Sequence, residues 1–96
     1  MLQFSADNFD ALELEAQERA EEVSVFTVRA VCDGLDADVD VVSVGYMKNL
    51  NMEITCERKG FFEALALNIK RCEDAEEYEL CKRARIWIKK LEDEKE

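Results

Sequence analysis

Residues that could carry chemistry are few and widely spaced in this chain. It has no histidine, which excludes the commonest general base and the usual catalytic triads. None of its serines lies in a GxSxG sequence, and Gly34, Gly45 and Gly60 stand too far apart to form a phosphate-binding loop. The chain holds 23 aspartates and glutamates, but no spacing marks a catalytic pair among them. We therefore expect a protein that is not an enzyme.

The four cysteines also give no sign of a reactive or metal-binding site. Cys32, Cys56, Cys72 and Cys81 form no CxxC pair, whereas zinc and iron–sulfur sites need closely spaced ligands. Such cysteines usually serve as small buried hydrophobic residues. We expect no metal and no cofactor.

One aspartate cluster resembles the start of a calcium loop. Asp36, Asp38 and Asp40 have the alternate spacing of the first ligands in a helix–loop–helix calcium site. That loop needs glycine next and glutamate at its twelfth position, where this chain has Val41 and Met47. The sequence therefore favours a solvated turn over a calcium site.

Length and composition indicate one globular domain over residues 1–96. Its 48% hydrophobic content is too high for a disordered acidic tail. The chain lacks the ~20 consecutive apolar residues that span a bilayer, and it does not begin with a basic segment and long apolar run like a signal peptide. We expect a cytoplasmic protein (in the host cytoplasm if it is viral) with reduced cysteines and no membrane partner.

Periodicity positions the charged residues on an α+β fold. Residues 8–22 have helical composition and spacing, and residues 61–72 and 75–94 predict two further helices. Valine-rich residues 23–32 also fit helical spacing, but their β-branched content favours a strand. Residues 39–47 and 52–57 predict two more strands. Val41-Val42 interrupts the alternation of the second strand, which indicates either a bulge or a strand covered on both faces. The expected fold is a three-stranded antiparallel sheet with helices on one face, in the order α-β-β-β-α-α.

Charge is concentrated at the N-terminal end. The net charge is −10 overall, and residues 1–23 hold seven acids against one arginine. On a helical projection, Leu14 points away from the apolar face, and Asp7, Asp10, Glu18 and Glu21 surround it. Asp33-Gly34 predicts a turn between the first two strands. A second acidic group crowds this expected turn: Asp33, Asp36, Asp38 and Asp40. In the last helix, Ile86 projects outward among lysines and arginines. These ten residues are our candidate partner-binding residues.

A net charge of −10 disfavours direct nucleic-acid binding, which needs basic surface. Small size, concentrated negative charge and absence of chemistry are typical of phage or mobile-element inhibitors of the anti-CRISPR or anti-restriction kind. We therefore expect an acidic module that binds a protein with a basic, nucleic-acid-binding surface. The alternative is a homo-oligomeric structural or assembly adaptor, for example a homodimer, that associates through its last helix, where Ile86 is exposed, or through a sheet edge.

Overall fold

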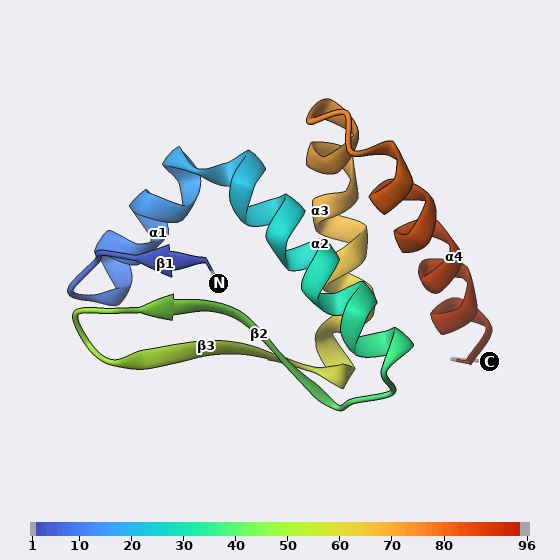
Figure 1. Cartoon of the computed structure of the whole chain (residues 1–96), viewed down its shortest axis with the longest axis horizontal. Helices are drawn as coiled ribbons and strands as arrows, with labels where there is room; N and C mark the ends of the chain where they lie inside the picture. The colour runs from blue at the N-terminus through green and yellow to red at the C-terminus, as the bar shows by residue number, and fades with distance from the viewer. Residues whose placement is uncertain (1, 95–96) are drawn as a thin grey trace.

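A computed structural model describes residues 2–94 of the chain (Figure 1). Its elements, in chain order, are β1 (Gln3–Phe4), α1 (Phe9–Glu18), α2 (Ala20–Asp36), β2 (Val41–Met47), β3 (Met52–Glu57), a 3₁₀ turn (Arg58–Gly60), α3 (Phe61–Asp74) and α4 (Tyr78–Glu94). The α+β class and the last four predicted helical and strand regions are confirmed within small boundary shifts. The predicted order omits β1 and is wrong at one further element.

That element is the strand expected over residues 23–32, which lies inside the helix α2. Its buried residues Ser24, Val28, Val31 and Leu35 recur at helical spacing, so one stripe of the helix faces the core. The β-branched valines favour a strand only weakly, and burial of this stripe against α3 outweighs that preference. The helical alternative noted for this segment is the correct one.

The sheet is mixed, not antiparallel as predicted. Its strand order is β1-β2-β3, with β1 parallel to β2 and β2 antiparallel to β3. The Tyr46 amide donates to the Leu2 carbonyl at 2.9 Å, and the Lys48 amide donates to the Phe4 carbonyl at 3.2 Å. Because α1 and α2 form a long connection between β1 and β2, these two strands can run parallel. A two-residue strand is too short to be recognised from its sequence.

A β-bulge lies in β2, as the sequence indicated, but two residues later. The register shifts between Ser43 and Gly45, so Val44 is the extra residue. Gly34 lets β2 approach α2 closely, because a Cβ atom there would stand 2.2 Å from Val42 Cγ1. The turn predicted at Asp33-Gly34 is therefore wrong, because both residues lie inside α2 and Gly34 is where this helix contacts β2.

The main core is formed by α2, α3 and α4, which lie beside one another above the hairpin in Figure 1. Its fully buried side chains include Val28, Phe61, Leu65 and Ala84. The helix α1 lies at the other end of the molecule and has no buried residue. It is therefore a peripheral element, fastened mainly by polar contacts.

Candidate functional site

The outer face of α1 presents unpaired carboxylates around an exposed leucine. Asn8 caps the helix by accepting the Ala11 amide at 2.8 Å. Leu14 is 63% exposed, as predicted, and Asp10 and Glu18 lie one turn before and after it. Neither carboxylate has a hydrogen-bond or ion-pair partner among residues 2–94, and both are exposed. We call Asp10, Leu14 and Glu18 the acidic face.

The inner side of α1 uses its charges to hold the N-terminal strand. Glu15 carboxylate oxygens accept the Ser5 amide at 3.0 Å and the Ala6 amide at 2.9 Å. Arg19 donates to the Gln3 carbonyl at 2.7 Å and also bonds Glu15 and Glu22. The Ser5 and Ala6 amides, with Arg19, lower the pKa of Glu15 despite partial desolvation. The one arginine of this region is thus fully engaged, and none is left for the outer carboxylates.

The helical projection places Asp7 and Glu21 on the same helix as Leu14. In the structure both residues lie beyond the ends of α1. Asp7 precedes the Asn8 cap and accepts a hydrogen bond from Asn49 Nδ2 at 3.0 Å. Arg19 leaves the helical conformation, with φ −112° and ψ 29°, so Glu21 belongs to the first turn of α2. The predicted continuous stripe is therefore divided into the acidic face of α1 and a separate carboxylate on α2.

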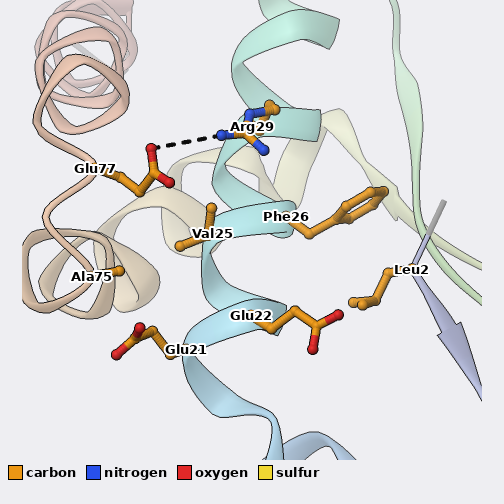
Figure 2. A pocket seen from close by; sticks show the side chains of 8 residues that line it. All are labelled: Leu2, Glu21, Glu22, Val25, Phe26, Arg29, Ala75 and Glu77. Carbon is orange, nitrogen blue, oxygen red and sulfur yellow. Dashed lines mark ion pairs between the residues drawn. The ribbon is translucent and has the colours of Figure 1, made fainter.

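Glu21 lines a surface hollow of about 420 Å³ on the first turns of α2 (Figure 2). The hollow is formed by Leu2 of the N-terminal segment, by Glu21, Glu22, Val25, Phe26 and Arg29 of α2, and by Ala75 and Glu77 of the α3–α4 turn. In Figure 2, Val25 lies on the side of α2 that carries Glu21 and faces Glu77, and Phe26 points the other way toward Leu2. Arg29 pairs with Glu77 at 3.8 Å. Glu21 has no such partner in the described part of the chain.

Sequence reasoning missed this hollow because residues 23–32 were assigned to a strand. Glu21, Val25 and Arg29 follow one another at four-residue spacing and therefore share one face of α2. Recognition of the helix would have placed them together. The contributions of Leu2 and Ala75 come from distant segments and carry no local signal.

The second predicted acidic group is separate from the first and is paired within the molecule. Asp33 and Asp36 lie in the last turns of α2, roughly 20 Å along the helix from Glu21. Arg83 of α4 donates to Asp33 at 2.8 Å and to Asp36 at 2.7 Å.

The other two aspartates of this group, Asp38 and Asp40, lie in the α2–β2 connection. Arg58 contacts them at 3.1 Å and 3.9 Å respectively. All four aspartates therefore have cationic partners that hold α2, α4 and the hairpin together.

Ile86 is 49% exposed on α4, as predicted, and it lies on a basic face. Lys82 and Lys89, one turn before and after it, are exposed and have no partner among residues 2–94. Arg85 is bonded to Glu73, and Lys90 lies over the Trp87 ring, 4.6 Å from its centroid. We call Lys82, Ile86 and Lys89 the basic face.

The remaining chemistry-bearing groups form no reactive cluster. Burial raises the pKa of Cys32 and Cys72 to about 11, so both thiols are protonated at neutral pH. Within residues 2–94, no group of three or more His, Cys, Asp or Glu residues is placed to hold a metal ion. No helix in this range is both long and apolar enough to cross a membrane.

Comparison of the chain with models of protein families, with curated proteins and with solved structures gives no match. The function of the chain is therefore inferred from its own residues.

Proposed function

We propose that this chain is an acidic protein-binding module that uses the α1 end of the molecule to bind a basic surface of a partner protein. The observation that carries the proposal is the pairing of its charges. Asp10, Glu13, Glu18 and Glu21 are exposed and have no cation partner in the described chain, whereas Asp33, Asp36, Asp38 and Asp40 are all paired. The four aspartates that hold the fold are neutralised, and Asp10, Glu13, Glu18 and Glu21 remain available.

The exposure of these carboxylates determines what they contribute. An exposed ion pair stabilises a complex by less than about 1 kcal/mol, so affinity must come from several pairs together with apolar contact. Leu14, exposed between Asp10 and Glu18, supplies such a contact. The combined negative field also speeds encounter with a basic surface, and salt weakens this effect.

The hollow on the first turns of α2 fits the same kind of partner. A lysine or arginine side chain can lay its aliphatic part on an apolar surface while its charge remains near water and an anion. Val25 offers that surface, and the unpaired Glu21 on the same side of α2 offers the anion. The hollow would thus receive a basic side chain of the partner.

A finer form of the proposal is that the partner binds nucleic acid and is inhibited, as anti-CRISPR and anti-restriction proteins inhibit their targets. Its support is charge density. Residues 10–21 carry four unpaired carboxylates over roughly 17 Å of chain at helical rise, or about one charge per 4–5 Å. One strand of B-DNA carries a charge every ~3.4 Å. The density is of the same order, over a short length.

The test is affinity capture with two variants of equal charge. The first changes Asp10, Glu13, Glu18 and Glu21 to their amides. The control changes four other glutamates to glutamine: Glu53, Glu63, Glu79 and Glu92. These glutamates are also exposed and unpaired in the described range. The parent and the control should capture the same protein at about 0.05 M salt and release it by about 0.5 M, whereas the first variant should not capture it.

Equal capture by both variants, or capture insensitive to salt, would overturn the proposal. The finer form is tested on the captured protein, because the parent should displace a labelled nucleic acid from it. A partner that holds its nucleic acid in the presence of excess chain is not inhibited in this way.

A further inference from the structure

The basic face of α4 and the acidic face of α1 have the same layout with opposite charge. In each, one aliphatic side chain lies between two charged residues that are a helical turn away on either side. Asp10 and Glu18 are about 12 Å apart along α1, and Lys82 and Lys89 are about 11 Å apart along α4, at 1.5 Å per residue. Leu14 and Ile86 are 63% and 49% exposed. The two faces are therefore complementary in charge, spacing and apolar centre.

These faces cannot meet within one molecule. The molecule is 40 Å long, and α1 and α4 lie at opposite ends of that axis in Figure 1. We propose that the acidic face of one copy binds the basic face of a second copy, in a head-to-tail contact. The contact is heterologous, since each copy contributes a different surface. It therefore either closes into a ring, whose smallest form is an antiparallel pair of copies with two such contacts, or repeats as an open chain of copies.

The net charge of −10 opposes association, but distance limits this repulsion. At physiological ionic strength the screening length is about 8 Å, far shorter than the 40 Å molecule. The charges at the interface then decide the sign of the interaction. The nearby carboxylates of the same chain are bonded to Arg83 and Arg85. Lys82 and Lys89 therefore remain free to pair with carboxylates of a second copy.

This self-association uses the same acidic face as the proposed partner, so a bound partner would cap a growing assembly. The two ideas remain separable. Lys82 and Lys89 are remote from the acidic end, so changing them should abolish self-association and leave capture of the partner intact.

The experiment uses two charge-reversed chains. One carries Asp10→Lys and Glu18→Lys, which makes both faces basic, and the other carries Lys82→Glu and Lys89→Glu, which makes both faces acidic. Sedimentation and light scattering are measured for each, for the parent, and for an equimolar mixture. The parent should assemble with rising concentration, and each reversed chain alone should associate at least about tenfold more weakly. The mixture should regain assembly, because each end again meets its opposite.

A chain carrying Glu53→Lys and Glu63→Lys has the same net charge as the first reversed chain and should assemble at least as well as the parent. Circular dichroism should show that all variants are folded. A parent that stays monomeric up to about 1 mM would overturn the proposal. So would a mixture that remains monomeric while the parent assembles, since that result would indicate a contact between like faces.

Discussion

Glu15 and Glu18 are only three residues apart on α1, yet they have opposite roles. Glu15 binds two backbone amides of the N-terminal segment and Arg19, so it belongs to the fold. Glu18 faces solvent and has no partner in residues 2–94. A carboxylate near several donors is hydrogen-bonded within the fold, and one without donors is available to bind another molecule. This difference separates structural from binding residues in a chain with many acids.

The first prediction concerns Glu15 and pH. Its pKa is lowered in the fold from the ordinary value of 4.5, so its contribution to stability is present above that value and is lost as pH falls through the folded pKa. We expect Glu15→Gln to destabilise the β1–α1 attachment at neutral pH and to reduce the loss of stability on acidification. Urea unfolding between pH 7 and pH 3 measures this.

Glu13→Gln is the matched control, because Glu13 is exposed and has no partner in the described residues. It should keep the parent's acid dependence. If Glu15→Gln and Glu13→Gln have the same pH profile, Glu15 does not anchor the N-terminal strand.

Exposure of single residues could be predicted from the sequence, but their pairing could not. The outward projections of Leu14 and Ile86 follow from helical periodicity and are found in the structure. The bonds of Arg83 to Asp33 and Asp36 join residues about 50 positions apart, and no local pattern indicates them. The aspartate group therefore looked available in the sequence and is paired in the fold.

At the scale of elements, the helix ends explain where prediction failed. Both α2 and α3 end in a left-handed capping residue that is neither glycine nor asparagine: Asp38 with φ 56° and Glu76 with φ 61°. In each, two amides bond back to the last turn, from Asp38 and Val39 in α2 and from Glu76 and Glu77 in α3. Without the usual glycine signal, the sequence pointed to Asp33-Gly34 as the turn, inside α2.

The second prediction follows from Glu76. A non-glycine residue with positive φ is strained, and glycine is not. We expect Glu76→Gly to stabilise the protein by about 0.5–1 kcal/mol in urea unfolding. Ala66→Gly, at an exposed position inside α3, should destabilise it by about 1 kcal/mol. If Glu76→Gly destabilises the protein to a similar extent, the capping conformation at Glu76 is not the one described.

For the whole molecule, the sequence indicated the α+β class but not the path of the chain. The missing strand was supplied by Gln3–Phe4, which pairs with β2 only because two helices carry the chain from one strand to the other. Such a pairing joins residues more than 40 positions apart. Periodicity describes local structure and does not report which distant strands meet.

The third prediction concerns salt and the whole charge distribution. Unpaired acids at the α1 end repel one another in the folded state, and a net charge of −10 adds to this repulsion. We expect about 0.5 M sodium chloride to raise the melting temperature by about 3 °C or more. Salt should raise the melting temperature less in the variant with amides at Asp10, Glu13, Glu18 and Glu21. A melting temperature that falls with salt would contradict this prediction.

Trp87 is the only tryptophan of the chain, and its place gives the molecule an internal optical probe. Its indole N–H donates to Asp36 at 2.8 Å, and the Lys90 ammonium lies over its ring, so its emission is sensitive to the charges at the α2–α4 junction. That junction adjoins the basic face and is remote from α1 (Figure 1). Contact at the α4 end will therefore alter the Trp87 fluorescence. Binding of a partner without tryptophan at the α1 end will leave the Trp87 emission unchanged.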